Sequence, residues 1–133
     1  MKNIWIITLI LVAYAAEAIA QDSEITITSP NDETSVGLRP LIKGTVTGHS
    51  ATVWVVVHPV ETEDFWVQPR VKVSPDGTWK VRIYIGRPGS EDIGKFFEVR
   101  AVKNPTKSLK KGDVLGGWPN AEVSSYVIEL ERE

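Results

Sequence analysis

The segment VWVVVHPVETEDFWVQ contains a histidine and three acidic residues in close succession: His58, Glu61, Glu63 and Asp64. A histidine beside carboxylates could bind a metal ion or act as a general base, and two facing carboxylates could cleave a glycosidic bond. A metal site needs three or four converging ligands, but the other histidine, His49, would lie roughly 25–30 Å away along an extended strand. We therefore predict that His58 ends a strand and that the acidic residues form a solvated turn.

Three common catalytic and nucleotide-binding motifs are missing from the sequence. It has no Gly-X-Ser-X-Gly elbow, no P-loop and no dinucleotide-binding fingerprint. We therefore predict a protein without catalytic residues, metal site or cofactor. A small hydrolase or inhibitor that acts through residues 61–64 is an alternative.

The four tryptophans after residue 20 fall into two pairs. Two lie in strand-like apolar runs, and the predicted core consists of Trp54, Trp79, Val81, Ile83, Phe97 and Val99. Trp66 and Trp118 stand beside proline and polar residues, where an aromatic ring could cap the end of the fold or contact a sugar ring or a partner's side chain. If these two come together, they would form a ligand-binding patch of Phe65, Trp66, Gln68 and Trp118.

The elements that would position these residues are predicted from hydrophobic alternation. No segment after residue 20 shows a helical period, whereas apolar and polar residues alternate repeatedly, most clearly over residues 79–85. Runs rich in proline and glycine separate these strands, at residues 29–33, 47–50, 74–77, 86–94 and 104–120. Seven or eight short strands at this spacing predict an all-β antiparallel β-sandwich.

Residues 104–120 form a segment longer than most loops, so we expect a short extra strand near residues 114–115 or a functional role. The strand at residues 53–57 is apolar on both faces, although a sandwich strand usually has one face in water. Its outer face should therefore be covered by residues 104–120 or by another protein chain. Three lysines of that segment should be solvated or meet an acidic partner: Lys107, Lys110 and Lys111.

Residues 1–20 have the layout of a secretory signal peptide, with an early lysine, an apolar run and small residues at the end. We predict an N-terminal signal helix that is cleaved before Gln21, with Ala18 marking a second candidate site. A retained membrane anchor is the alternative, but a span needs about 20 apolar residues and Glu17 interrupts this run. We therefore expect membrane contact only transiently, through the signal segment.

Residues 21–133 are predicted to form a single domain in the periplasm or outside the cell. The chain has no cysteine, so it can form neither disulfides nor a thiol-linked lipid anchor, and apolar burial must stabilise the domain. The formal net charge is −2, whereas a nucleic-acid partner would call for a strongly basic face. We therefore predict no nucleic-acid partner.

Three segments resemble immunoglobulin-like (Ig-like) modules of bacterial extracellular proteins. ITITSPNDETSV followed by LIKGTV resembles their opening strand, bend and second strand, SPDGTWKVRI is similar to their Asp-Gly hairpin, and FFEVRAV looks like their penultimate strand. The resemblance covers most of residues 24–103 and implies an Ig-like antiparallel β-sandwich of about seven to eight strands. Family members often occur as tandem repeats, whereas here one module is expected to be the whole mature protein. Calcium-binding members carry Asp and Asn near the strand ends, and the C-terminal half lacks a clear Asp-X-Asp set.

We predict a non-catalytic binding or interaction module whose partner is a protein or a cell-envelope glycan. A second interpretation is a structural subunit of a surface assembly. Such a subunit would polymerise through exposed strand edges or through the apolar outer face of residues 53–57.

Overall fold

The computed structural model describes residues 24–48 and 50–133. The predicted signal helix at residues 1–20 and His49 lie outside these residues. Eleven β-strands make up the regular structure of the described residues, and none of these residues belongs to a helix that could cross a membrane. The prediction of an all-β fold is confirmed.

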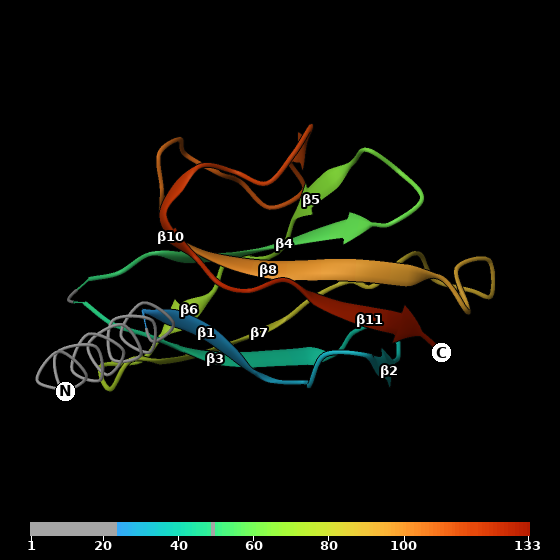
Figure 1. Ribbon diagram of the computed structural model, residues 1–133, viewed down its shortest axis with the longest axis horizontal. Coiled ribbons are helices and arrows are strands. Elements are labelled where there is room, and N and C mark those ends of the chain that lie inside the picture. The colour runs from blue at the N-terminus through green and yellow to red at the C-terminus, as the bar shows by residue number, and fades with distance from the viewer. Residues whose placement is uncertain (1–23, 49) are drawn as a thin grey trace, which may run out of the picture.

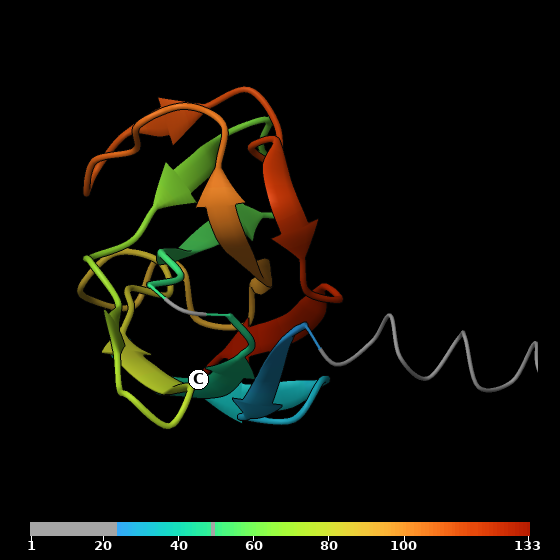
Figure 2. The same ribbon diagram turned by 90° about the vertical axis from the view of Figure 1, so that its left-hand side faces the viewer.

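The strands form two sheets that lie as separate layers (Figure 1 and Figure 2). The smaller sheet has the order β1-β3-β7-β6 and consists of β1 (Ile25–Ser29), β3 (Leu41–Val46), β7 (Thr78–Arg82) and β6 (Lys72–Val73). The larger sheet has the order β2-β11-β8-β4-β5-β9, and β10 also pairs with β8. Its strands are β2 (Thr34–Val36), β4 (Val53–Pro59), β5 (Phe65–Val67), β8 (Phe96–Pro105), β9 (Val114–Leu115), β10 (Ala121–Ser124) and β11 (Ile128–Arg132).

The strand pairing and the number of strands both differ from the prediction. One pair, β2 with β11, is parallel, while the other pairs are antiparallel. The number of strands exceeds seven or eight because β2, β5, β6 and β9 contain only two or three residues each. Two or three residues are too few to show alternation, and β9 was expected only because its segment is longer than most loops.

Both sheets turn an apolar face toward one shared core. In β7, Trp79 and Val81 are buried while their neighbours along the strand are exposed, as period-two alternation requires. Five of the six residues predicted for the core are buried in it: Trp79, Val81, Ile83, Phe97 and Val99. The two sheets thus enclose a common core in the manner of a β-sandwich.

Trp54 is the sixth predicted core residue, and its position corrects the prediction. Val53, Val55 and Val57 belong to the core cluster, so the alternation of β4 turns Trp54 to the opposite face, where it is half-buried. The prediction was wrong because β4 is apolar on both faces, and its sequence does not show which face points inward.

Gly44 lets Trp79 pack closely against the smaller sheet. The two residues are direct partners across β3 and β7. A Cβ atom at position 44 would collide with the indole ring of Trp79 and with the backbone carbonyl oxygen of Thr26. The glycine in LIKGTV is therefore required by side-chain packing across the sheet.

The segment that connects β8 to β10 covers the outer face of the larger sheet. Val56 and Val102 on this face are fully buried although they lie outside the core cluster. Trp118 from the connecting segment lies over the guanidinium group of Arg100, which is the cross-strand partner of Val56. β9 in the same segment pairs with β5, which confirms the predicted short strand at residues 114–115.

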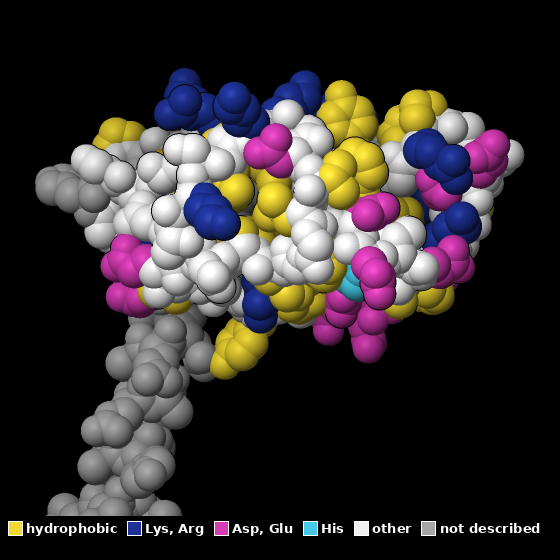
Figure 3. All heavy atoms as spheres, turned by 90° about the horizontal axis from the view of Figure 1, so that it is seen from above, with side chains coloured by type: hydrophobic (Ala, Val, Ile, Leu, Met, Phe, Trp, Pro, Cys, Tyr) yellow, Lys and Arg dark blue, Asp and Glu magenta, His cyan; other side chains and the backbone are white. Residues whose placement is uncertain are grey.

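Lysine and arginine side chains gather along one edge of the face seen in Figure 3.

Strands β10 and β11 follow the same edge of β8, with a register change between them. Ser125 lies between the two strands, at the register change. Its backbone N–H donates to the carbonyl oxygen of Ala101 at 2.8 Å, and its hydroxyl oxygen accepts from the Ala101 N–H at 2.9 Å. The same hydroxyl donates to the carbonyl oxygen of Tyr126 at 2.9 Å. Ser125 therefore satisfies a buried backbone donor that the register change would leave unpaired.

Candidate functional site

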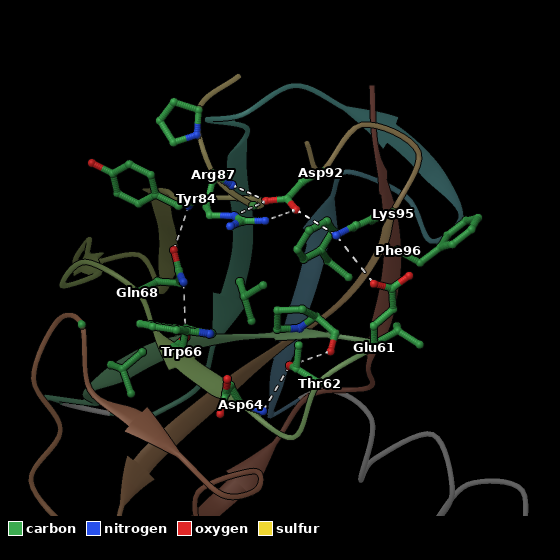
Figure 4. Close-up of a pocket in the computed structure, with 18 of the residues that line it drawn as sticks. Glu61, Thr62, Asp64, Trp66, Gln68, Tyr84, Arg87, Asp92, Lys95 and Phe96 are labelled. Atoms are coloured by element: carbon green, nitrogen blue, oxygen red, sulfur yellow. Dashed lines mark hydrogen bonds and ion pairs between the residues drawn. The ribbon is translucent and has the colours of Figure 1, made fainter. Parts of the chain in front are cut away.

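A cavity of about 660 Å³ opens between the two sheets at one end of the domain. Its interior continues the core, since the core residues Val57 and Phe97 line it. Four connections contribute residues to its lining, at positions 60–64, 68–69, 84–95 and 111–112, and side chains of the first three surround a common space in Figure 4. A volume of this size is typical of small-molecule and side-chain binding pockets.

Trp66 forms one wall of the cavity. It is the cross-strand partner of Val57, whose side chain faces the core, so the indole lies on the inner side of β5. Phe65, the preceding residue, therefore lies on the outer side. Trp66 is 42% exposed, which leaves part of its ring open at the mouth of the cavity.

Gln68 ties the two sheets together beside Trp66 (Figure 4). Its side chain is buried, and its Oε1 accepts a hydrogen bond of 2.8 Å from the backbone N–H of Tyr84. Its Nε2 donates to the carbonyl oxygen of Trp66 at 3.2 Å. An amide oxygen has two lone pairs and an amide nitrogen two protons, so each group keeps capacity for one further hydrogen bond.

Tyr84 lies on the opposite side of the mouth from the acidic turn (Figure 4). The guanidinium group of Arg39 stacks over its ring at 3.8 Å. Because the stack fixes one face of the phenol ring, Tyr84 can serve as a preoriented part of the rim.

Asp92 organises the turn at residues 86–95. Its buried carboxylate accepts the backbone N–H of Arg87 at 2.7 Å and two guanidinium N–H groups of the same residue at 3.2 Å. Lys95 Nζ lies 3.2 Å from the other side of the carboxylate. Hydrogen bonds from Arg87, side chain and backbone, hold the pKa of Asp92 well below its usual range. Gly86 has a φ of +82°, and a Cβ there would press on Asp92.

Arg132, in the last strand β11, also holds the turn at residues 86–95 in place. It is buried, and its Nη1 donates to the carbonyl oxygens of Ile85 and Arg87, both at 2.9 Å. Its Nη2 donates to the carbonyl oxygen of Gly89 at 3.1 Å. The last strand of the fold therefore fixes the wall of the cavity.

The ionisable residues that line the cavity balance one another. Three are acidic and three are basic: Glu61, Asp64, Asp92, Arg87, Lys95 and Lys111. Lys95 connects two of the acids, since its Nζ also lies 3.7 Å from Glu61 Oε2. The lining therefore carries no formal net charge.

The surroundings of Asp92 do not favour a role for this residue in proton transfer. A carboxyl group that acts as a general acid needs a raised pKa, whereas the pKa of Asp92 is lowered and its oxygens are engaged by Arg87 and Lys95. Within residues 24–48 and 50–133, no group of three histidine, cysteine or acidic side chains could hold a metal ion.

An aromatic cluster lies outside the cavity, on the outer face of the larger sheet. The rings of His58 and Phe65 are stacked 4.1 Å apart, and Trp118 meets Phe65 edge-on at 4.8 Å. The two ring nitrogens of His58 lie 2.7 Å from a carboxylate oxygen of Glu98 and 2.7 Å from the carbonyl oxygen of Thr62. His58 thus anchors the acidic turn to the sheet, near the end of β4.

The structure divides the predicted ligand-binding patch into two parts. Phe65 and Trp118 touch each other in the outer cluster, whereas Trp66 and Gln68 line the cavity. Sequence reasoning missed Arg87, Asp92 and Arg132, although the run GRPGSEDIG marks the turn that they fix.

Two comparisons with known proteins give no match for this chain. No protein-family model matches the chain, and the comparison with curated proteins finds no match either. The function is therefore inferred from the geometry of the cavity.

Proposed function

We propose that the chain is an exported Ig-like module that binds a partner protein, without catalysis, through the cavity between its sheets. The strand order supports the Ig-like assignment, because β1-β3-β7-β6 faces β11-β8-β4-β5 across the core. This order corresponds to the A-B-E-D and G-F-C-C′ sheets of Ig-like sandwiches. The signal-like pattern at residues 1–20 supports a location in the periplasm or outside the cell.

The observation that carries the binding role is where the exposed apolar side chains gather. Seven large hydrophobic residues are exposed among the described residues, and four of them line the cavity: Val60, Trp66, Tyr84 and Phe96. Each is between 40% and 48% exposed. Apolar side chains concentrated around a pocket, with charged residues at the edge, are typical of protein-binding sites.

The cavity suits a protein better than a cell-envelope glycan. A sugar carries many hydroxyl groups, and each one that is buried without a partner costs about 1–3 kcal/mol. Several polar groups of the lining are already engaged within the fold. The Thr62 hydroxyl donates to the carbonyl oxygen of Pro59 at 3.1 Å, and Arg87 and Lys95 engage the Asp92 carboxylate.

Selection of peptides from a phage-displayed random library on the immobilised protein tests the proposal. We expect apolar peptides whose affinity falls at least about tenfold in Trp66→Ala, because central aromatic residues dominate such interfaces. The matched control is Tyr126→Ala, since Tyr126 is 72% exposed and lies outside the cavity lining. Peptides that bind wild type and Trp66→Ala equally would refute the proposal, as would a selection that yields no binding peptide.

A further inference from the structure

We infer that the group that enters the cavity is an uncharged apolar ring, aromatic or prolyl, carried by a peptide whose backbone amide binds Gln68. This inference rests on the proposed function and names the chemistry of its ligand. It depends on three observations: the charge balance of the lining, the spare hydrogen-bonding capacity of Gln68, and the fixed shape of the walls.

The charge balance favours a neutral ligand. A carboxylate or ammonium group loses its hydration on entering the cavity and must find an opposite charge there. Arg87 and Lys95 are already paired with Asp92, and Glu61 is paired with Lys95. A charged group that enters beside Asp92 would have to break one of these pairs, whereas an uncharged ring leaves them intact. Asp64 and Lys111 also line the cavity with opposite charges, so the lining as a whole attracts neither sign.

Gln68 favours a peptide group next to that ring. Its amide already bridges Trp66 and Tyr84, and it keeps one N–H and one lone pair for a further partner. A backbone peptide group offers the matching acceptor and donor. Gln68 is only 4% exposed and lines the cavity, so a ligand that reaches it must be inserted between the sheets.

The fixed walls favour a rigid ring over a flexible chain. Gln68 holds one side of the cavity, while Asp92 and Arg132 hold the turn at residues 86–95. An aromatic or prolyl ring loses little conformational freedom on insertion, whereas a long acyl chain must give up many rotamers. The aromatic residues Trp66 and Phe96 line the same cavity and can contact an inserted ring.

NMR titration of the ¹⁵N-labelled protein tests the inference with four small probes at millimolar concentration. N-acetyl-L-tryptophanamide carries a neutral ring with peptide groups, and N-acetyl-L-tryptophan carries the same ring with a carboxylate. N-acetylglucosamine and decanoate represent a glycan and an acyl chain. We expect the amide to shift the side-chain signals of Gln68 and Trp66, and to bind about tenfold more tightly than the carboxylate.

Two variants sharpen the comparison. Gln68→Glu keeps an acceptor for the Tyr84 N–H but removes the amide donor and adds a charge, so affinity for the amide probe should fall about tenfold. Lys107→Glu is the control, because Lys107 is exposed and lies outside the cavity lining. It should change the affinity for the neutral probe by less than about twofold. Comparing the two tryptophan probes on wild type needs no variant and stays decisive if Gln68→Glu fails to fold.

The outcomes separate the inference from the proposed function. If N-acetylglucosamine or decanoate shifts the cavity signals and the amide does not, the inferred ligand class is wrong while binding at the cavity stands. Equal affinity for the amide and the carboxylate overturns the neutral-ligand inference in the same way. If no probe shifts the cavity signals, both the inference and the proposed function fall.

Discussion

Replacing Asp92 by asparagine should loosen the turn that forms one wall of the cavity, whereas replacing Glu91 by glutamine should not. Both acids contact the same arginine, since Arg87 Nη2 lies 3.2 Å from Asp92 and 3.1 Å from Glu91. Their surroundings differ, because the side chain of Asp92 is 8% exposed and that of Glu91 is 71% exposed. The two variants therefore compare a buried carboxylate with an exposed one in a single turn.

The expected cost of Asp92→Asn follows from the bonds that the carboxylate accepts. Asparagine can still accept the backbone N–H of Arg87, which donates at 2.7 Å in the wild type. Its neutral amide loses the charge-assisted bonds from the Arg87 guanidinium and from Lys95, and its NH₂ group has donors as neighbours. Weakening bonds to a buried charged group costs about 1–3 kcal/mol, which lowers Tm by about 4–12 °C in a domain of this size. Glu91→Gln should change Tm little, because an exposed ion pair contributes little.

The contribution of the Asp92 carboxylate to the free energy of unfolding should fall as the pH is lowered. The pKa of Asp92 is lowered in the folded state relative to the ordinary value of about 3.9 for an unfolded chain. Its stabilisation is therefore complete above about pH 5 and is lost as the pH falls through the lowered pKa. The difference in the free energy of unfolding between wild type and Asp92→Asn should thus be constant near neutral pH and shrink in acid.

Urea unfolding monitored by tryptophan fluorescence, repeated between neutral pH and about pH 2, measures this difference for both variants. If Asp92→Asn and Glu91→Gln lower the free energy of unfolding equally, the buried hydrogen bonds do not hold the turn. A difference between wild type and Asp92→Asn that stays the same in acid would also refute the reasoning.

Two further predictions concern the frame around the site. Gly44→Ala should cost at least about 3 kcal/mol or prevent folding, because its methyl group collides with Trp79, whereas Gly116→Ala has open space and should be neutral. Thermal unfolding measures the stability of both variants. A Gly44→Ala protein that folds and has the Tm of the wild type would contradict the prediction. Ser125→Ala should cost about 1–3 kcal/mol because it leaves the buried N–H of its strand partner unsatisfied. Ser124→Ala, at an exposed position, is its control in chemical denaturation, and equal losses would contradict the assignment.

The sequence predicted the strands best where one face is apolar and the other polar. β7 is such a strand, and Trp79 and Val81 lie in the core as expected. β4 is apolar on both faces, so its alternation could not decide between Val55 and Trp54 as the core residue. The choice depended on the packing of the other sheet and of the connecting segment, which a local pattern does not contain.

The candidate site was predicted only in part for a similar reason. The aromatic residues around β5 were recognised, but consecutive residues of a strand point to opposite faces, so Phe65 joins Trp118 outside and Trp66 enters the cavity. The cavity itself arises where four connections meet, far apart in the sequence. Asp92 and Arg132 hold one wall of the cavity in place through hydrogen bonds to backbone groups, and a local residue pattern does not predict such bonds.

The most direct test of the central claim is to locate a bound probe by NMR. Intermolecular NOEs between the indole protons of N-acetyl-L-tryptophanamide and the ¹³C-labelled protein would show which side of β5 the ring occupies. Binding in the cavity predicts NOEs to the methyl groups of Val57 and Val60, which line it. NOEs confined to Phe65 and Trp118 would place the probe on the outer cluster and contradict the claim.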